Sequence, residues 1–498
     1  MSEAFLTVFL ILFPMFMFLL MVGMPHKNPK WLALAGTVVE FAVSIYMWVN
    51  FDPAADRQFA VRIPWANSIG ITFNVGIDGI SFPLVLLTTT LIPLIILSSS
   101  DKNFNRPSLF YGLVLLMQSA LIGVFTSFDV ILFYIFWELA LIPIYLICLI
   151  WGNEKEGKVT IKFFIYTLAG SLLMLVGILY VYMSSDGGLA PAGFSLTTFY
   201  ELGKHLDPRT QGFVFWMMFV AFAIKMPVFP FHTWQPETYT KAPTQGTMLL
   251  SAIMLKMGIY GVIRWLIPVL PAGVAEWGNT ALILSVIGIV YASCIALVQT
   301  NLKTLVAYSS IAHVGLISAG VFTQSVIGIQ GAMIQMFSHG LIVFGLFYLI
   351  DIIQHKTGSA EFKDLGGIRN VAPKFTTAFV VIMLGSVALP LTSGFVGEFL
   401  LINSLVQYQV WIGAVAALTI ILGAVYMLVA FQKSMSGEAQ PHIAAFTDLS
   451  MGEKVVLYPV VILIVIIGVY PGPLMAVSEP AVTALVNSLS ELTSSIRP

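Results

Sequence analysis

Residues 219–234 read FVAFAIKMPVFPFHTW, an apolar run that carries Lys225 in its middle and two prolines directly behind it. An ionised side chain at the centre of a bilayer costs about 2.5–3.5 kcal/mol on insertion scales. Proline removes one backbone N–H and frees the carbonyl four residues earlier, so Pro227 and Pro230 free carbonyls on both sides of the charge. Broken backbone at membrane depth is tolerated where it is buried in protein or lines a water-filled cavity. The stretch therefore predicts a membrane protein whose interior holds a charged site.

The composition of the whole chain agrees with a membrane protein. Of its 498 residues, 58% are hydrophobic and 9% are charged, whereas a soluble chain carries about 25% charged residues. This shortfall excludes a water-soluble protein. The net charge of −1 gives no sign of nucleic acid as a partner.

Cofactor motifs do not stand out in the sequence. Its two cysteines, Cys148 and Cys294, cannot supply the four thiolates of an iron–sulfur cluster. Neither a nucleotide-binding glycine motif nor an HExxH zinc motif occurs. We therefore expect this chain to hold no cofactor, no metal and no redox centre.

Apolar runs of about 20 residues, each long enough to span a bilayer, alternate with short polar breaks. They predict an all-α polytopic membrane protein with fourteen transmembrane helices. The predicted ranges are 4–24, 31–50, 80–99, 109–126, 128–151, 162–184, 211–230, 243–265, 279–299, 303–322, 327–354, 374–404, 409–431 and 454–473. The first run lacks a basic leader and is long enough to span, so we interpret it as an uncleaved helix.

Lysine and arginine divide unequally between the two ends of these helices. One side takes Lys27, Lys30, Lys102, Arg106, Lys155, Lys158, Lys162, Lys241, Lys303, Lys356, Lys363, Arg369, Lys374, Lys433 and Lys454. The other side takes Arg57, Arg62, Lys204, Arg209, Arg264 and Arg497. By the positive-inside rule the richer side faces the cytoplasm, and both termini face the other compartment.

Several other ionisable residues fall at membrane depth. They are Glu40, Glu138, Lys256, His313, His339 and Glu398. Polar groups can simply hold membrane helices together, and for Glu40 or His339 alone this interpretation is as good as a functional one. For two acids and two lysines in one chain a functional interpretation is favoured, because neutral groups would join helices at lower cost.

Helix breakers accompany the charges. Pro143 follows Glu138, and Pro390 begins a weak stretch with Thr392 and Ser393 that ends at Glu398. Glu138, Lys225 and Glu398 therefore each lie beside a predicted kink or hydrated cavity.

The helices form two series about 170 residues apart, five helices each. Because five is odd, the second series enters the membrane from the opposite side, which is typical of inverted repeats in transporters. We predict helices 1–3 in 1–108, the first repeat in 109–265, the second repeat in 279–431, and a loop, the last helix and a tail in 432–498. In this register the surroundings of Ser310 and His313 correspond to Glu138.

The kinds of side chain indicate what moves through the protein. Carboxylates, amines and imidazoles all exchange protons, and proton relays in pumps consist of such groups. Burial lowers the proton affinity of a lysine and a nearby carboxylate raises it, so a change at Glu138 would switch Lys225. Sodium needs several oxygen ligands, and the lysines at the central positions argue against such a site. The predicted cargo is therefore the proton.

Eight stretches carry a family resemblance. They are GIDGIS (76–81), FWELALIPIY (136–145), KFFIYTLAGS (162–171), KMPVFPFHTWQPETYTKAPTQG (225–246), IMLKMGIYG (253–261), SSIAHVG (309–315), SHGL (338–341) and LPLTSGFVGEFL (389–400). In order and spacing they resemble the antiporter-like membrane subunits of respiratory complex I, or NADH–quinone oxidoreductase, across nearly the whole chain. Glu398, where sister subunits usually have lysine, and the short tail resemble the chain M type, the counterpart of NADH dehydrogenase subunit 4.

The resemblance implies a role for each matching residue. Lys225 would hold the proton of the first half-channel, with Glu138 as the carboxylate that tunes it. Lys256 would pass protons along a hydrated axis through His313 and His339, and Glu398 would exchange them towards the outer compartment.

Two further positions match the family on the proton pathway. They are His232, just beyond the broken helix, and Asp129, at the outer end of the fifth. The loop that follows His232 departs from the family pattern, because residues 235–241 lack the second histidine that relatives often have.

By this resemblance we predict a proton-translocating subunit of a multi-subunit NADH:quinone oxidoreductase in the bacterial inner membrane. Its partners would be the lipid bilayer and other membrane subunits of complex I, especially two sister antiporter-like subunits. NADH, FMN, iron–sulfur clusters and quinone would belong to the complex. The alternatives are a subunit of a multi-subunit sodium/proton antiporter or membrane-bound hydrogenase, and a purely structural spacer. A membrane-embedded hydrolase is less well supported.

Overall fold

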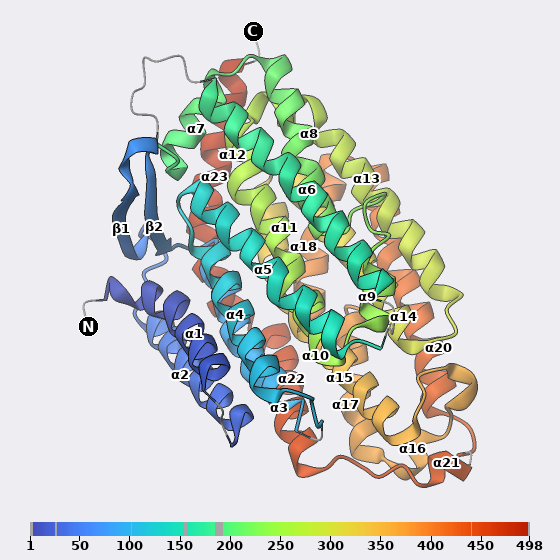
Figure 1. The fold of residues 1–498 in the computed structure, drawn as a ribbon. Coiled ribbons are helices and arrows are strands. Elements are labelled where there is room, and N and C mark those ends of the chain that lie inside the picture. The colour runs from blue at the N-terminus through green and yellow to red at the C-terminus, as the bar shows by residue number, and fades with distance from the viewer. Residues whose placement is uncertain are drawn as a thin grey trace.

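The computed structural model describes residues 3–24, 27–100, 102–153, 157–184, 193–439 and 441–496. Lys155 and Arg497, two residues of the charge count above, lie outside these ranges. The described chain is a bundle of long helices with one small hairpin at its edge (Figure 1).

The N-terminal half runs from the edge of the bundle to its centre. Its elements are α1 (Phe5–Gly23), α2 (Pro29–Val49), β1 (Gln58–Ala66), η1 (Asn67–Ile69), β2 (Ile71–Ile77), α3 (Phe82–Leu97), α4 (Pro107–Thr126), α5 (Val130–Trp151), α6 (Lys158–Met183), α7 (Leu196–His205), α8 (Pro208–Lys225), α9 (Gln235–Lys241), α10 (Thr244–Met248), η2 (Leu249–Met254), α11 (Leu255–Gly261), η3 (Val262–Leu266) and α12 (Ile267–Val269).

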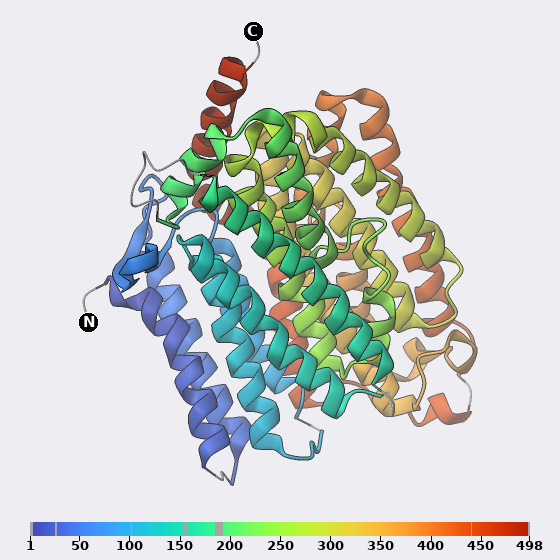
Figure 2. The same cartoon turned by 45° about the horizontal axis from the view of Figure 1, so that its top comes forward.

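The C-terminal half returns around that centre. Its elements are α13 (Pro271–Leu297), α14 (Leu302–Phe322), α15 (Val326–Thr357), η4 (Phe362–Asp364), α16 (Ile368–Val371), α17 (Pro373–Ser386), α18 (Ser393–Tyr408), α19 (Val410–Ala416), α20 (Leu418–Met435), α21 (Pro441–Ala444), α22 (Met451–Val469) and α23 (Gly472–Ile496). The last helix, α23, projects beyond the bundle at its C-terminal end (Figure 2).

The all-helical membrane fold that the sequence predicts is confirmed. Eleven helices among the described residues are long and apolar enough to cross a membrane, and two shorter apolar helices, α3 and α17, accompany them. Each of the fourteen predicted ranges contains a described helix. The count of fourteen crossings itself stays a prediction.

Burial separates central helices from peripheral ones. In the most apolar window of the segment Thr244–Val269 and of α15, every residue is buried, whereas the corresponding windows of α1, α2 and α22 are 33% buried. The exposed faces of the peripheral helices are apolar, as lipid contact requires. The segment Thr244–Val269 and α15 therefore form the core of the bundle, where a polar site is isolated from lipid.

Two elements that the hydropathy pattern does not predict lie at one end of the bundle. The antiparallel hairpin of β1 and β2 sits beside α1 and α7 (Figure 1). The amphipathic helix α7 begins at Ser195, whose hydroxyl accepts the backbone N–H of Thr198. Both are too short and too polar to register as spanning runs.

The helix breaks predicted around Lys225 and Pro390 are present. Helix α8 ends at Lys225, and the N–H of Val228 bonds to the carbonyl of Ala223, which Pro227 leaves free, at 2.9 Å. Helix α17 ends at Ser386, and the N–H of Leu389 bonds to the carbonyl of Leu384 at 3.0 Å. At each break, a wider turn therefore forms, in which an N–H bonds to the carbonyl five residues earlier.

The interruption expected at Pro143 is absent, because α5 continues through that residue from Val130 to Trp151. Membrane helices tolerate an internal proline when neighbouring groups satisfy the freed carbonyl. The charge on Glu138 therefore lies on a continuous helix.

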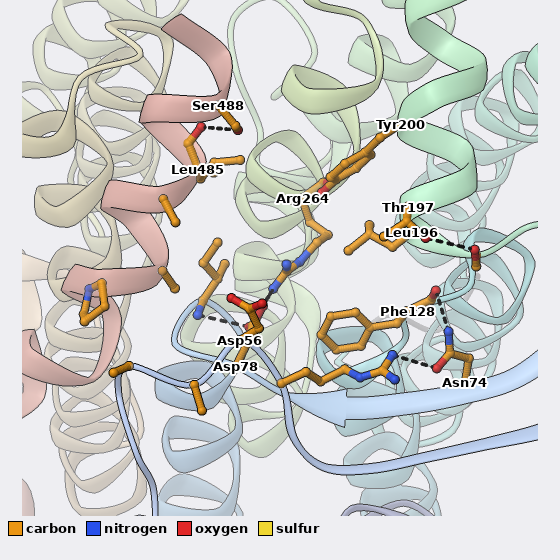
Figure 3. A pocket seen from close by; sticks show the side chains of 18 of the residues that line it. Asp56, Asn74, Asp78, Phe128, Leu196, Thr197, Tyr200, Arg264, Leu485 and Ser488 are labelled. Carbon is orange, nitrogen blue, oxygen red and sulfur yellow. Dashed lines mark hydrogen bonds and ion pairs between the residues drawn. The ribbon is translucent and has the colours of Figure 1, made fainter. Parts of the chain in front are cut away.

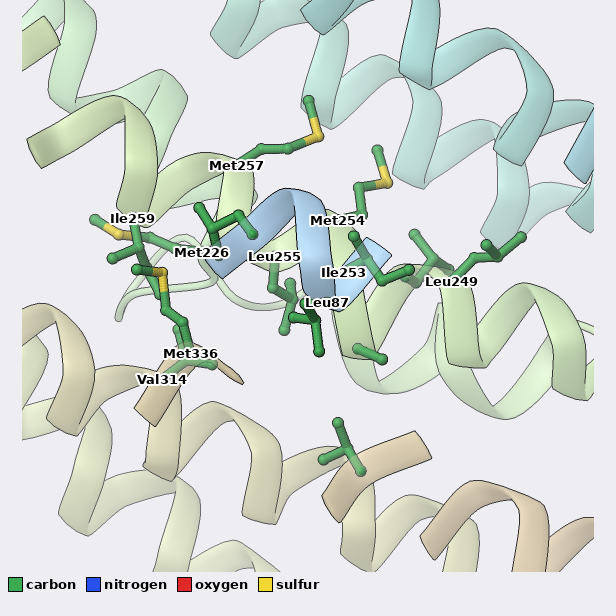
Figure 4. Close-up of a cluster of buried hydrophobic side chains, with 14 of the residues drawn as sticks. Leu87, Met226, Leu249, Ile253, Met254, Leu255, Met257, Ile259, Val314 and Met336 are labelled. Carbon is green, nitrogen blue, oxygen red and sulfur yellow. The ribbon is translucent and has the colours of Figure 1, made fainter. Parts of the chain in front are cut away.

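The segment Thr244–Val269 carries two π-helical turns, η2 and η3, on either side of α11. Such turns often occur at functional sites. Large apolar side chains from α3, α8, α14 and α15 pack around this segment (Figure 4). Lys256 is therefore held in a fully buried part of the bundle.

Candidate functional site

The first polar unit lies between α5 and α8. Lys225 is 3% exposed, and its Nζ atom lies 5.3 Å from the centre of the Trp137 ring. Glu138 is half-buried on the next position of α5 and has a side-chain hydrogen bond with Tyr134, while its Oε1 atom has no partner among the described residues. The two charges interact electrostatically, and no direct ion pair joins them in the described structure. The ammonium thus rests on an aromatic face near a carboxylate with one unpaired oxygen.

The second polar unit starts at Lys256, which is fully buried. Its Nζ atom donates to the Ser251 carbonyl at 2.8 Å and lies 3.0 Å from Nδ1 of His339 on α15. The Nε2 atom of the same ring lies 3.2 Å from the hydroxyl of Ser310 on α14. A charged Lys256 donates to Nδ1, which leaves the ring proton on Nε2, facing Ser310. Three helices thereby meet in one hydrogen-bonded line.

His313 and Glu398 form the next step. Nδ1 of His313 lies 2.8 Å from Oε1 of Glu398, although the ring N–H does not point along that line. Gln335 donates to the same carboxylate oxygen at 3.3 Å. A Cβ on Gly397 would lie 2.3 Å from Oε1 of Gln335, so only glycine lets α18 approach α15 this closely.

A small cavity joins the two histidines. The His313 and His339 rings lie 6.1 Å apart, and both line a space of about 10 Å³. That is about the volume in which one water molecule fits. Nε2 of His313 and Oε2 of Glu398, residues that line this space, have no hydrogen-bond partner among the described residues. A single water can therefore bind to His313 and Glu398 next to the His339 ring.

His232 and Asp129 lie apart from this line. His232 is 4% exposed, beside the rings of Phe229 and Tyr291, and no described residue pairs with its Nδ1 atom. Asp129 caps α5 by accepting the N–H groups of Ile131 and Leu132, and its other oxygen accepts from Thr72 of β2. This geometry makes Asp129 a helix cap that ties the hairpin to the bundle.

Glu40, whose role the sequence leaves open, pairs with an amide. Gln118 of α4 donates its side-chain N–H to Glu40 of α2, and Oε1 of each residue has no partner in the described part of the chain. Both side chains are buried. The contact joins the peripheral helix α2 to the buried helix α4, and none of its described hydrogen bonds reaches the line around Lys256.

Sequence reasoning missed a buried ion pair at the hairpin end. Nη2 of Arg264 donates to both oxygens of Asp78 at 2.6 Å. The pair lies at a cavity of about 540 Å³ between the hairpin, α7 and α23 (Figure 3). The charge count places Arg264 on the outer side, at the end of the predicted helix 243–265; in the structure it lies within η3 and is 5% exposed. The only signal in the sequence is the aspartate of GIDGIS.

A second missed ion pair lies at the opposite end of the bundle. Asp351 accepts from Lys102 at 3.0 Å and from the hydroxyl of Thr244 at 2.7 Å. These residues come from three distant parts of the chain, so no local pattern reveals them. Within the described ranges no cluster of three or more His, Cys, Asp or Glu side chains suits a metal ion.

Two family models match adjoining parts of the chain. The model described as NADH:quinone oxidoreductase/Mrp antiporter, TM covers residues 127–423, and the model described as NADH-ubiquinone oxidoreductase chain 4, amino terminus, covers residues 8–124. NADH-quinone oxidoreductase subunit M of Rickettsia prowazekii (strain Madrid E) is 38% identical over 97% of this chain and 98% of its own. Its counterpart in Rhodobacter capsulatus is 37% identical over 93% of this chain and 91% of its own.

Solved structures agree. A chain of respiratory complex I from Thermus thermophilus with bound NADH superposes with a TM-score of 0.88 at 29% identity, over 98% of this chain and all of that one. A chain of the Mrp complex from Dietzia sp. DQ12-45-1b superposes with a TM-score of 0.85 over 99% of both chains, but at 18% identity this match shows the fold alone. The chain belongs to the NADH-quinone oxidoreductase subunit M family, which corresponds to NADH-ubiquinone oxidoreductase chain 4.

Proposed function

We propose that this chain translocates protons as a membrane subunit of an NADH:quinone oxidoreductase. The observation that carries the proposal is the buried line from Lys256 through His339 and the one-water cavity to His313 and Glu398. Every member of this line can gain or lose a proton, and the lipid-facing helices isolate it. A neutral spacer would need none of these groups.

The geometry supports a definite order of proton transfer. Lys256 gives its proton to Nδ1 of His339, and the proton on Nε2 leaves the ring towards the Ser310 hydroxyl. A water in the cavity that His339 shares with His313 would carry a proton on to His313, and this ring then turns to align its N–H with the Glu398 carboxylate, 2.8 Å away. An imidazole accepts at one nitrogen and donates at the other, so the two rings can relay a proton.

Glu138 would control the entry to this route. Its negative charge favours the charged form of Lys225, so displacing or protonating the carboxylate makes the lysine release its proton. Moving one charge against 100 mV requires about 2.3 kcal/mol, so the drive comes from redox chemistry outside this chain. His232 would serve the same entry, as the buried ring beyond the break at Lys225.

The rest of the assembly follows from the same proposal. NADH, FMN, iron–sulfur clusters and quinone belong to other subunits, and this chain holds no redox centre. Sister antiporter-like subunits flank it in a bacterial inner membrane.

We also propose that residues 109–265 and 279–431 are inverted repeats, with 1–108 and 432–498 as additions. Asn301 caps α14 as Asp129 caps α5, each accepting the N–H groups two and three residues on. Each cap also forms an antiparallel bridge, to Ser195 and Glu361 respectively. The matching local structures support the repeat.

The second candidate is a subunit of a multi-subunit sodium/proton antiporter or a membrane-bound hydrogenase, which the shared fold with the Mrp chain favours. Glu398 in place of a lysine speaks against the antiporter. Neighbouring genes for iron–sulfur subunits would decide between the two candidates.

The test is to assay Glu138→Gln and Lys225→Ala in the assembled complex, with quinone reduction and proton uptake followed together. We expect both variants to lose proton uptake, because neither retains the carboxylate–ammonium switch. Lys162→Ala is the control, since it removes an exposed lysine whose ion pair with Glu237 lies on the surface. Full pumping by both switch variants would reject the mechanism and leave the structural spacer.

A further inference from the structure

The cavity at the hairpin end of the bundle carries more positive than negative charge. Its volume of about 540 Å³ lies within the range of small-molecule sites. Three arginines and two aspartates line it, so one positive charge is in excess. Arg264 and Asp78 neutralise each other through their ion pair. The excess therefore lies with Arg57 and Arg62, which share the cavity wall with one further acid, Asp56.

An irregularity in β1 lets both arginines face this cavity. Arg57 directly precedes β1, and Arg62 lies within it. Side chains alternate along a strand, so positions five residues apart point to opposite faces. The pairing with β2 shifts by one residue between Gln58 and Val61, where Phe59 has a left-handed φ of 50°. The extra residue reverses the alternation, and both arginines line the same cavity.

Neighbouring residues hold the Arg57 guanidinium in place without neutralising it. Its Nη1 atom donates to Oδ1 of Asn74 at 2.9 Å, and its Cζ atom lies 5.1 Å from the centre of the Phe128 ring. Asn74 is fixed in turn, because its Nδ2 atom donates to the carbonyl of Phe128 at 3.2 Å (Figure 3). A Cβ on Gly76 would lie 2.8 Å from Cγ of Arg57, so this glycine leaves room for the arginine stem.

No carboxylate among the described residues forms an ion pair with Arg57 or Arg62. Burial and the nearby charge of Arg62 lower the pKa of Arg57 below its usual value, although Asp78 opposes this change. The two guanidinium groups therefore repel each other, and an anion bound beside both of them would remove this repulsion. Arg57 is thus oriented as a binding group and keeps N–H donors for a ligand.

We propose that this cavity binds the phosphate group of a phospholipid through Arg57 and Arg62. A planar guanidinium presents paired N–H donors that match the oxygens of a phosphate. The site is separate from the line around Lys256, so the inference goes beyond the proposed function and does not depend on it.

The surroundings of the two arginines favour a lipid over a free phosphate ion. Helix α23 contributes an apolar wall with Pro480, Ala481 and Leu485, which suits the glycerol and the first acyl carbons. Trp65 of β1 is 60% exposed, and tryptophan is enriched where lipid headgroups meet the hydrocarbon. The charge count predicts the outer side of the membrane for this end, so the lipid would come from the outer leaflet.

The test measures how lipid protects Arg57 and Arg62 from phenylglyoxal, which modifies accessible guanidinium groups. The assembled complex is depleted of lipid by detergent exchange and treated with the reagent in the presence of dihexanoyl phosphatidylglycerol, and peptide mass spectrometry gives the rate at each arginine. We expect both rates to fall about tenfold at a lipid concentration about ten times the dissociation constant. Arg209, an exposed arginine that does not line the cavity, should react at an unchanged rate.

Two further ligands identify what is bound. Dihexanoylglycerol has the same acyl chains without a phosphate, and inorganic phosphate has no chains. At the same concentration we expect neither to protect the arginines. Equal protection by dihexanoylglycerol would overturn the recognition of phosphate, and equal protection by inorganic phosphate would overturn the lipid as its source. Arginines that stay unreactive after phosphorus analysis shows the lipid to be gone would overturn the proposal in favour of a covering subunit.

Matched variants separate a fixed geometry from charge alone. Arg57→Gln removes one guanidinium, so we expect Arg62 to lose most of its protection. Gly76→Ala keeps every charge but displaces the Arg57 stem, so we expect the lipid to bind several-fold more weakly. Arg209→Gln should bind lipid as the wild type does. Quinone reduction before lipid removal shows that each variant is assembled, and wild-type protection in Arg57→Gln would overturn the proposal.

If Gly76→Ala does not assemble, Arg57→Lys tests the same point. Lysine keeps the charge but lacks the planar fork of the guanidinium, so we expect weaker binding of the lipid, measured by the protection of Arg62. Wild-type affinity in Arg57→Lys would show that charge alone attracts the lipid and would overturn a built phosphate site.

Discussion

His339 is the residue on which the second polar unit depends, because its two ring nitrogens contact Lys256 and Ser310. We expect His339→Ala to slow proton transfer by about 100-fold, the lower end of what a positioned acid–base group contributes. Ser310→Ala should have a smaller effect, since the histidine keeps its contact with Lys256. Both variants are assayed in the assembled complex by proton uptake and quinone reduction. Equal rates in His339→Ala and the wild type would contradict the order of transfer proposed above.

Among elements, α5 gives the clearest separation of a structural from a proton-carrying role. Asp129 caps this helix with two accepted bonds and accepts two more from Thr72, while Asn301 caps α14 with the same two capping bonds from a side chain that cannot titrate. We therefore expect Asp129→Asn to pump at the wild-type rate. Asp129→Ala should destabilise the start of α5 by about 1 kcal/mol. Thermal stability and pumping distinguish the two, and loss of pumping in Asp129→Asn would show that the carboxylate carries protons.

A second cap makes the stability of α17 depend on pH. Asp448, in the loop before α22, accepts the backbone N–H groups of Lys374, Phe375 and Leu449 at 3.1, 2.9 and 2.8 Å. Burial raises the pKa of Asp448, but these N–H donors lower it by more, so the pKa lies below its usual value. A lowered folded-state pKa contributes stability above the unfolded value of about 3.9, and this contribution is lost as the pH falls through the folded-state pKa.

We accordingly expect Asp448→Ala to weaken the first turn of α17 by about 1 kcal/mol at pH 7, as loss of a helix cap does. Hydrogen exchange of the amides of Lys374 and Phe375, corrected for their intrinsic rates, reports this change. The difference from the wild type should shrink below about pH 4, where the wild-type carboxylate begins to lose its charge. If the variant and the wild type differ as much below about pH 4 as at pH 7, the charge of Asp448 does not contribute to the cap.

The elements also show what sequence can and cannot predict. Apolar runs gave the ranges of the long helices, and the prolines behind Lys225 and before Leu391 marked both breaks. Periodicity could not reveal the hairpin, because two short strands between spanning helices add little apolar length. The capping role of Asp129 follows only from the path of the chain around it.

For the site, the resemblance supplied candidate side chains but not the contacts that they make. His339 meets Lys256, and Lys102 meets Asp351, across large separations along the chain that no local pattern encodes. The cavity between His313 and His339 depends on how three helices pack, which the sequence does not state.

At the scale of the whole molecule, the two missed ion pairs lie at opposite ends of the bundle, and the charge count predicts which end faces the cytoplasm. Cysteine labelling can test this, because the chain has only two cysteines and Cys148 is buried. In a Cys294→Ser background we expect a membrane-impermeant maleimide to label Arg209→Cys from outside intact cells and to leave Lys241→Cys unlabelled. Both positions are exposed. The reverse pattern would invert the predicted orientation.

The π-helical turn η2, just before Lys256, holds one residue more than an ordinary helical turn. Deleting one residue between Leu249 and Met254 would therefore let the segment return to a regular α-helix, while Lys256 keeps its direction towards His339. A deletion within α11, which has no such extra residue, would instead turn the rest of the helix by about 100°. In alignments of related chains, a one-residue gap in the η2 segment should accordingly leave the contact between the lysine and the histidine in place.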